Sequence, residues 1–409
     1  MATSVSDHRH ETEVCAAAKA FPRVYMLELW SYIPYYVAAL SLALEKRGVE
    51  VVLGSARYHL DRSYFDKAGA HTDRRLIDIG GGLTNRTLRR VVKSAEYILN
   101  LGLLLLRLAL ARPDVVHVQF LPFLDHGVPI ELWFLRLLRR LGVPIVHTAH
   151  NVANPEHEHL NKGLYASAYQ LADLIICHGD QARSRLESEF EISPSKVRVI
   201  PHGPLFQYLP NCSPSEARAK LALPAGEPLI VCAGVISEYK GIPFLLRSWE
   251  KVVRRGGPGK LLIAGTGDPE LLHSIRELVD SLGIGSSVEL RLTFIPVEDL
   301  PLIHQAADIL VYPYKAGTTS GALLTGMQYG KAIVATDLPV FQEHLRNLHN
   351  ALLIPYGDET ALAEALLELI QSPSYREQLA HALHERSQPT MSWAAIADRT
   401  IDCYRSLAK

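Results

Sequence analysis

Three consecutive stretches decide the fold of this chain: ADILVYPY at residues 307–314, KAGTTSGALLTGMQYG at 315–330 and KAIVATDLP at 331–339. The first and third are short apolar runs, which are typical of buried strands. The middle stretch begins with small polar residues and turns into a helical pattern that opens near Ser320 and stops at Gly330. We therefore predict a strand, a loop, a helix and a second strand, which together make one βαβ unit of a parallel sheet.

The loop of this unit is the first candidate for a binding site. Its residues Thr318, Thr319, Ser320 and Gly321 bring hydroxyl groups and unpaired backbone N–H groups to the start of the predicted helix. Such a helix start attracts anions, and open parallel sheets bind ligands beyond the carboxyl ends of their strands. A phosphate-bearing ligand is therefore expected here, although a well-capped loop that binds nothing explains the same residues.

Length and composition indicate a two-domain globular protein. The chain has 409 residues, more than one ordinary core holds, with 48% hydrophobic and 21% charged residues. A formal net charge of -1 gives no reason to expect a nucleic-acid partner. The first residues contain neither a basic start nor an apolar run, so we expect no secretory signal and a cytoplasmic protein. The cysteines are scattered and read as reduced thiols: Cys15, Cys177, Cys212, Cys232 and Cys403.

Strand and helix patterns alternate along the whole chain, interrupted by one stretch rich in turn-forming residues. We predict an α/β protein with parallel sheets, divided into a flexible lead-in (1–20), a first Rossmann-like domain (21–205), a linker (206–225), a second Rossmann-like domain (226–388) and a terminal helical segment (389–409).

The first domain opens with a strand pattern from Arg23, followed by a loop rich in aromatic residues. Trp30, Tyr32 and Tyr35 are placed near the carboxyl end of that strand, where aromatic rings can hold a sugar acceptor. Aromatic residues in such a loop also pack against one another without any ligand.

Residues 86–112 combine a strongly basic character with an apolar centre. The apolar part is too short to span a bilayer, but a cationic helix with an apolar body suits the interface of an anionic membrane. A second basic helix is predicted at 131–142. Two core helices with solvated basic edges explain the same pattern.

His150 directly follows the strand pattern PIVHTA, at a position that suits a ligand contact, although a single histidine is often structural. His157 and His159 lie in the segment HEHL, which resembles a metal site but lacks further ligands at helical spacing. We therefore expect no metal site.

The second domain supplies further candidates at strand ends. Lys240 lies in the strand-to-helix turn of residues 234–241, from which its long side chain can reach an anion in the crevice between the domains. Gly265 and Gly267 form a GxG turn after the next strand, which is a weak signal alone. Phe294 lies in a later loop, and Glu343 lies just past a strand end and is available to a ligand.

These segments add up to a known pattern, which extends from about Val197 to Pro373 and is weaker in the N-terminal half, where HTAHN supports it. The chain resembles the nucleotide-sugar-dependent glycosyltransferases of family 4 and their GT-B relatives. The resemblance implies two Rossmann-like domains facing each other across a cleft, with the last helix crossing back to the first domain. It also implies retaining transfer of a hexosyl group from a nucleoside diphosphate sugar, with no metal and no other cofactor required.

The resemblance also implies roles for individual residues. Lys240 matches the lysine that neutralises the donor diphosphate, and His150 contacts the donor sugar or orients the acceptor. The implied donor-binding residues are Gly234, Gly265, Gly267, Phe294, Thr318, Thr319, Ser320, Gly321, Thr325 and Glu343, and the acceptor residues are Trp30, Tyr32 and Tyr35. A fixed cation and aimed N–H groups would stabilise the charge that develops on the leaving diphosphate.

Two departures from the family pattern concern the donor site. Residues 234–236 read Gly-Val-Ile where the family usually carries an arginine. Gly317 and Thr325 stand where the family usually has two glutamates, so we expect the hydroxyl of Thr325 or another residue to hold the ribose.

The predicted function is transfer of a hexosyl group to a glycan, lipid-linked or other membrane-associated acceptor, at the inner face of the cytoplasmic membrane and with residues 86–112 touching anionic lipid. Two alternatives stay open: an inactive scaffold subunit with a decayed donor site, and a nucleotide-sugar epimerase. The epimerase would need acid and base groups around the sugar, and the sequence offers no convincing set.

Overall fold

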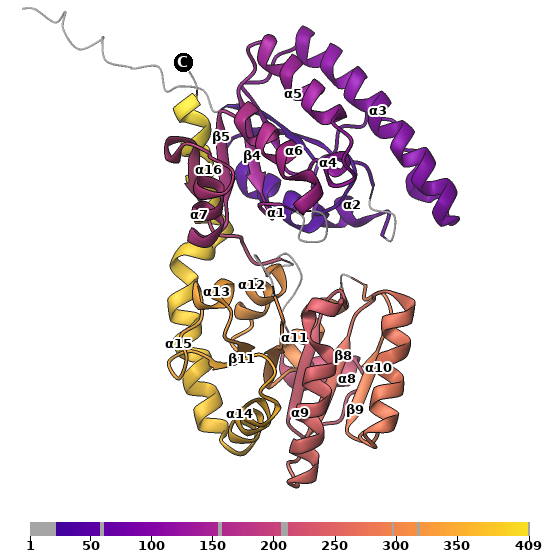
Figure 1. The fold of residues 1–409 in the computed structure, drawn as a ribbon, viewed down its shortest axis with the longest axis vertical. Helices are drawn as coiled ribbons and strands as arrows, with labels where there is room; N and C mark the ends of the chain where they lie inside the picture. Colours follow the sequence, from indigo (N-terminus) through magenta and orange to yellow (C-terminus); the bar gives the residue numbers. More distant parts are fainter. Residues whose placement is uncertain are drawn as a thin grey trace, which may run out of the picture.

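The computed structural model describes residues 22–57, 61–153, 158–205, 212–296, 298–316 and 320–407. It contains two parallel sheets of six strands each, with helices on both faces (Figure 1). The expected fold class is confirmed. The predicted residues Thr318 and Thr319 lie outside the described residues, as do Gly317 and His157.

The N-terminal sheet has the strand order β2-β1-β3-β4-β5-β6, and each adjacent pair is parallel. Its central strands are buried on both faces, as the long apolar runs require. The strands are β1 (Arg23–Leu27), β2 (Glu50–Gly54), β3 (Val115–Val118), β4 (Ile145–Ala149), β5 (Leu174–Cys177) and β6 (Val197–Val199). The helices are α1 (Pro34–Glu45), α2 (Tyr64–Ala68), α3 (Arg86–Leu110), α4 (Pro122–Asp125), α5 (Ile130–Arg140), α6 (Glu158–Leu171) and α7 (Asp180–Ser188).

The C-terminal sheet has the order β12-β11-β10-β7-β8-β9 and is also parallel. Its strands are β7 (Leu229–Ala233), β8 (Lys260–Ala264), β9 (Val288–Arg291), β10 (Ile309–Tyr312), β11 (Ala332–Thr336) and β12 (Leu352–Ile354). The helices are α8 (Pro214–Lys220), the short 3₁₀ helix η3 (Glu238–Lys240), α9 (Ile242–Arg254), α10 (Pro269–Ser281), α11 (Asp299–Ala306), α12 (Gly321–Met327), α13 (Pro339–Gln342), α14 (Glu359–Gln371), α15 (Pro373–Met391) and α16 (Trp393–Leu407).

The βαβ unit predicted from residues 307–339 is confirmed as β10, α12 and β11. Ser320 caps α12 with its hydroxyl, which accepts a hydrogen bond from the backbone N–H of Leu323 at 3.1 Å. Gly330 adopts φ +60° between this helix and β11, a left-handed conformation that glycine takes without strain.

The chain crosses between the domains along one side of the molecule, where α15 continues into α16 (Figure 1). The apolar face of α16 joins the core of the N-terminal domain, where it packs with α1. The hydroxyl of Tyr404 on α16 lies 2.6 Å from Nδ1 of the buried His117 on β3. The last helix therefore belongs to the hydrophobic core of the first domain.

Candidate active site

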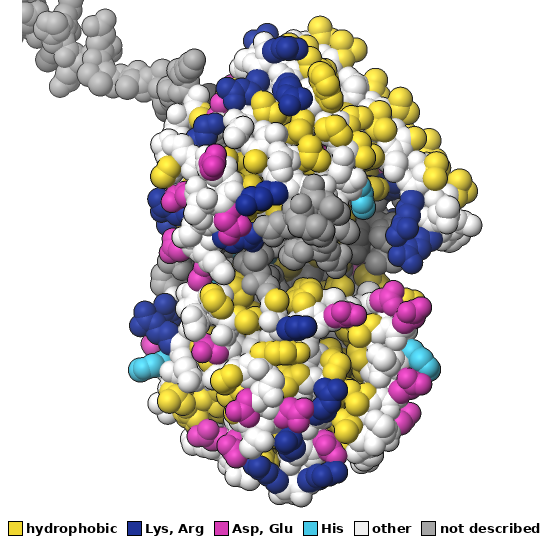
Figure 2. Space-filling model, in the orientation of Figure 1, with side chains coloured by type: hydrophobic (Ala, Val, Ile, Leu, Met, Phe, Trp, Pro, Cys, Tyr) yellow, Lys and Arg dark blue, Asp and Glu magenta, His cyan; other side chains and the backbone are white. Residues whose placement is uncertain are grey.

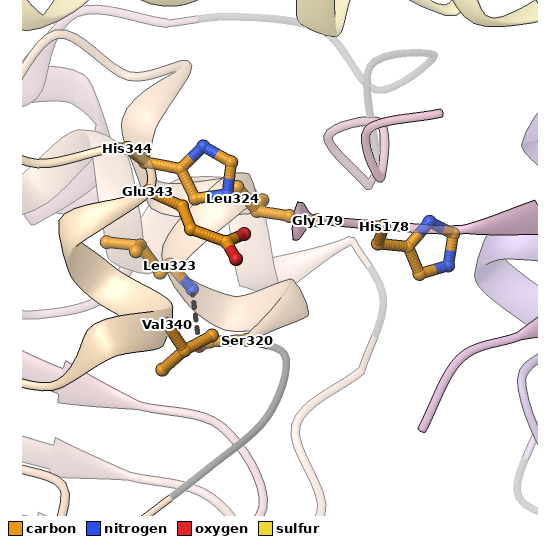
Figure 3. Close-up of a pocket in the computed structure, with 8 residues that line it drawn as sticks. All are labelled: His178, Gly179, Ser320, Leu323, Leu324, Val340, Glu343 and His344. Carbon is orange, nitrogen blue, oxygen red and sulfur yellow. Dashed lines mark hydrogen bonds between the residues drawn. The ribbon is translucent and has the colours of Figure 1, made fainter. Parts of the chain in front are cut away.

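The carboxyl ends of strands from both sheets meet at a small pocket between the domains. The N-terminal domain contributes His178 and Gly179, while α12 and the segment after β11 contribute the remaining lining residues (Figure 3): Ser320, Leu323, Leu324, Val340, Glu343 and His344. The pocket thus lies at the edge of both sheets where parallel α/β folds bind their ligands.

Lys240 is the last residue of the short helix η3, which follows β7 in the sequence, and the residue is 6% exposed. The ammonium nitrogen lies 5.4 Å from the centre of the Tyr314 ring and close to the backbone of Gly234, where a Cβ would be 2.9 Å from it. Apart from this ring, the ammonium has no hydrogen-bond or ion-pair partner among the described residues. A buried cation without a counterion is costly, so the position is suited to an anionic ligand.

The glycine turns after β7 and β8 pack directly against each other. A Cβ on Gly265, which has φ +151°, would collide with the carbonyl oxygen of Gly234, and a Cβ on Gly267 would collide with that of Ile236. The backbone N–H of Ile236 donates to the carbonyl of Thr266 at 2.7 Å, which extends the sheet past its last regular pair. The glycines therefore allow two strand-end loops to lie in contact beside Lys240.

Thr325 has a different contact from the one expected. Its hydroxyl is buried and accepts a hydrogen bond from the backbone N–H of Leu205 at 3.2 Å. The side chain of Gln328 donates to the carbonyl of the same Leu205 at 2.9 Å. Helix α12 thus holds the chain where it leaves the first domain, and a role for Thr325 at the ribose stays a prediction.

Glu343 also points to the other domain, although we expected it to be available to a ligand. Its carboxylate accepts a hydrogen bond from the backbone N–H of Gln181, in the first turn of α7, at 2.9 Å. A Cβ on Gly179 would overlap this carboxylate, so the close approach requires a glycine. Burial raises the pKa of Glu343, and the Gln181 N–H opposes that rise. Figure 3 shows Glu343 close to Gly179 in the pocket lining, so this contact joins the two domains at the pocket.

His150 belongs to a chain of hydrogen bonds behind the pocket. Its Nδ1 donates to Nε2 of His178 at 3.0 Å, and its Nε2, which carries the lone pair of the neutral ring, faces the side-chain amide of Gln119 at 3.0 Å. His178 donates from Nδ1 to the carbonyl of Ile200 at 3.1 Å. Burial lowers the pKa of His178 to about 4 and that of His150 well below its usual value, so both rings are neutral at pH 7.

His202 lies three residues past the end of β6, whereas His150 and His178 directly follow β4 and β5. The ring centroids of His178 and His202 are 5.2 Å apart, and the ring of Tyr36 on α1 lies 4.6 Å from His150 and 4.7 Å from His202. The sequence reasoning missed His178, His202 and Tyr36. Its own criterion of a polar residue directly after a parallel strand would have found His178, which follows β5 at once, but not His202.

The three aromatic residues proposed for the acceptor do not converge on one surface. Trp30 stacks on Phe123 at 5.7 Å within the partly buried edge of the core. Tyr32 is 59% exposed and stacks on Phe120 at 4.2 Å, while Tyr35 meets Tyr64 edge-on at 4.8 Å. Tyr32 is therefore the ring of the three that is open to a sugar, and all three roles stay predictions.

The loop that carries these rings is held by Glu28, which the sequence reasoning also missed. The carboxyl of Glu28 follows β1, is 1% exposed and accepts hydrogen bonds from the Tyr32 backbone at 2.6 Å and the Ser55 hydroxyl at 3.1 Å. Burial raises its pKa to about 8.

In the second domain Phe294 is half-buried in the loop after β9. Within the described ranges no three His, Cys, Asp or Glu side chains are grouped to hold a metal ion.

Comparisons with known proteins agree with this architecture. Residues 33–203 match the family Glycosyltransferase Family 4, and residues 227–372 match the family Glycosyl transferases group 1. Among similar structures, sucrose-phosphate synthase from Thermosynechococcus elongatus has a TM-score of 0.73 at 21% identity and covers 94% of this chain and 99% of that one. Anabaena HepE in complex with UDP-glucose has a TM-score of 0.72 at 15% identity, covering 94% and 100%. At these identities the likeness concerns the fold.

Two similar sequences are named D-inositol 3-phosphate glycosyltransferase. The protein from Saccharomonospora viridis is 28% identical over 65% of this chain and 65% of its own length, and that from Rhodococcus erythropolis is 29% identical over 66% and 64%. The chain thus matches slightly less than two thirds of these relatives. Since two glycosyltransferase families match successive halves of a chain with two facing parallel sheets, the protein belongs to the family 4 glycosyltransferases of the GT-B fold.

Proposed function

We propose that this protein transfers a hexosyl group, with retention at the anomeric carbon, from a nucleoside diphosphate sugar to a membrane-associated, glycan or lipid-linked acceptor. The observation that carries the proposal is the ammonium of the largely buried Lys240, which has no anionic partner among the described residues. Charge develops on the leaving diphosphate during transfer, and a fixed cation in a buried site stabilises it. The related structure named as a complex with UDP-glucose supports this class of donor.

Binding of nucleoside diphosphates tests the donor site. We expect one of UDP, GDP, TDP and ADP to raise the melting temperature of the protein at millimolar concentration, because a ligand that binds only the folded state stabilises it. The same nucleotide should give a smaller shift with Lys240→Ala. If no nucleotide shifts the melting temperature, the proposal is contradicted and the inactive scaffold is favoured. A shift together with sugar transfer to an added acceptor would exclude the inactive scaffold.

The acceptor has two sources of support. The relatives named D-inositol 3-phosphate glycosyltransferase favour a small phosphorylated polyol, either free or as a lipid headgroup. An exposed apolar surface on the first domain favours a membrane-associated acceptor (Figure 2). We call this surface the α3–α5 face and define it by its exposed apolar residues: Leu88, Val91, Ile98, Leu99, Leu103, Leu106, Leu110, Trp133 and Leu137.

Basic residues border this face. Arg86 and Arg90 at the start of α3 and Arg136 and Arg140 on α5 are exposed, and Arg136 lies over the Trp133 ring at 5.5 Å. None of the described helices combines the length and hydropathy that a bilayer span requires. An apolar surface with a cationic border suits peripheral attachment to anionic lipid, and we place this attachment at the cytoplasmic side of the membrane.

Leu99→Asp combined with Leu106→Asp is expected to weaken binding to vesicles containing phosphatidylglycerol about 100-fold, because each leucine inserted into the bilayer contributes about 1.5 kcal/mol or more. Pelleting with the vesicles measures the effect. Leu348→Asp is the matched control, since Leu348 is 65% exposed on the second domain. Equal pelleting of the double variant and the native protein would refute the membrane attachment.

A further inference from the structure

The Nε2 nitrogen of His202 faces the second domain and has no hydrogen-bond partner among the described residues. Its side chain is 7% exposed, and Nδ1 donates to the carbonyl of Gly203 at 2.6 Å. Nε2 therefore carries the lone pair of a neutral ring, and no described residue forms a hydrogen bond with it. A Cβ placed on Gly321, the first residue of α12, would lie 3.6 Å from Nε2 and Cε1 of His202. This edge of the ring thus faces the start of α12 across the domain boundary.

Lys240 approaches the next residue of the same helix. That residue is Ala322. A Cβ on Gly234 would lie 2.9 Å from the Lys240 ammonium and 3.9 Å from the Cβ of Ala322, so the backbone of Gly234 lies between the two residues. His202 from the first domain and Lys240 from the second therefore lie close to Gly321 and Ala322, and both residues are more than nine-tenths buried. Neither the His202 Nε2 nor the Lys240 ammonium forms a hydrogen bond or ion pair with a described residue. Polar heads that converge from two domains on one helix start without a partner suit a ligand there.

The charge of the expected ligand exceeds what Lys240 supplies. A nucleoside diphosphate carries at least two negative charges at neutral pH, and residues 234–236 before the lysine are uncharged. A neutral imidazole cannot offer Nε2 to a phosphate oxygen, since both atoms would be acceptors. With a proton on Nε2 the ring becomes a second cation and donates a charge-assisted hydrogen bond.

We propose that His202 is a second cationic ligand of the donor diphosphate and takes up a proton from solvent when the diphosphate enters between Lys240 and the start of α12. The inference rests on the proposed function. Without an anion, burial and the neighbouring His178 hold the pKa of His202 at about 3, so the ring is neutral in the free protein. An anion beside Nε2 raises the pKa, because it favours the charged form.

The groups around the ring favour this coupling. Tyr36 from α1, His150 after β4, His178 after β5 and His344 after α13 are the titratable neighbours. Burial holds the pKa of His178 and His344 at about 4, lowers that of His150 and raises that of Tyr36, so all four are uncharged between pH 6 and 9. The proton taken up on binding therefore goes to the ring that meets the phosphate.

Calorimetric titration with UDP, or with whichever diphosphate stabilises the protein, measures the proposed proton. Titrations at pH 6.5 in buffers of different ionisation enthalpy give the number of protons taken up. We expect the His202→Asn variant to take up fewer protons per bound nucleotide than the native protein, with a difference of up to one proton. The affinity ratio between them should be about tenfold at pH 6 and fall toward one at pH 9, because binding is linked to proton uptake and protons become scarcer as the pH rises. Titration of the nucleotide itself is common to both proteins and cancels in the ratio.

His304→Asn is the matched control, since His304 is also buried and bonded to a backbone carbonyl but lies on α11. It should leave proton uptake unchanged. His202→Gln repeats the test in case the asparagine variant fails to fold. Equal proton uptake and equal pH dependence in the native protein and a folded His202 variant would overturn the inference while leaving the donor site intact. A native protein that binds no diphosphate would overturn the proposed function and this inference together.

Discussion

Lys240→Ala is expected to lower kcat/KM for sugar transfer by about 10²–10³, which is the usual effect of removing one preorganised group that stabilises developing charge. Lys240 is largely buried, with its ammonium over the Tyr314 ring and close to the backbone of Gly234, so solvent cannot replace it efficiently. We expect kcat to fall more than donor affinity, because the charge on the diphosphate is larger in the transition state than in the bound donor. Steady-state kinetics with the donor identified by thermal shift measure both quantities.

The control for this variant is Lys251→Ala. Lys251 lies on α9 of the same domain, partly exposed and 3.5 Å from Glu359. Its loss should leave turnover unchanged, since surface ion pairs contribute little. The melting temperature of Lys240→Ala without nucleotide should stay close to that of the native protein, because the ammonium forms no ion pair with a described residue. Native-like turnover in Lys240→Ala would contradict the assigned role.

Trp393→Ala is expected to reduce the free energy of unfolding by about 3–5 kcal/mol, the usual cost of removing a buried tryptophan side chain. The indole is 8% exposed at the start of α16, and its N–H donates to the carbonyl of Pro204 at 2.7 Å. It packs against Tyr36 at 5.2 Å and against Gly203 so closely that a Cβ there would collide with the ring. The substitution leaves a cavity where the last helix meets the segment between the domains.

Urea denaturation measures this loss, and Trp133→Ala is the matched control. Trp133 lies on α5 with 63% of its surface exposed, so its removal should change stability by no more than about 0.5 kcal/mol. It should weaken vesicle binding instead, since it belongs to the α3–α5 face. A Trp393 variant as stable as the native protein would show that α16 contributes little to the first domain.

Much of the fold could be predicted because the relevant patterns are local. The βαβ unit at residues 307–339 appears in the sequence as two apolar runs around a capped helix, and the structure contains it within a few residues. The turn that carries Lys240 was found in the same way, since a strand, a glycine and a helix follow one another directly. Spacing along the chain suffices where the interacting residues are close in sequence.

Sequence spacing could not reveal the partners of Thr325 and Glu343. Thr325 bonds to the backbone of Leu205 and Glu343 to that of Gln181, and both contacts join the two domains. Such contacts depend on how the domains meet, which no periodic pattern of either domain describes. The resemblance suggested donor roles for these residues, whereas the structure provides interdomain partners.

The amino-acid sequence determined the two parallel α/β domains, the family and the position of the buried lysine, because apolar periodicity, glycine turns and motif spacing act over short stretches of chain. Only the tertiary structure brought His150, His178 and His202 together, since their contact depends on β4, β5 and β6 being neighbours in one sheet. It also decided that Tyr36 rather than Tyr35 meets these rings, and that the apolar body of α3 leaves a long face exposed. Strand order and helix rotation arise from packing across the whole domain, so residues far apart in sequence acquire their neighbours only when the chain is folded.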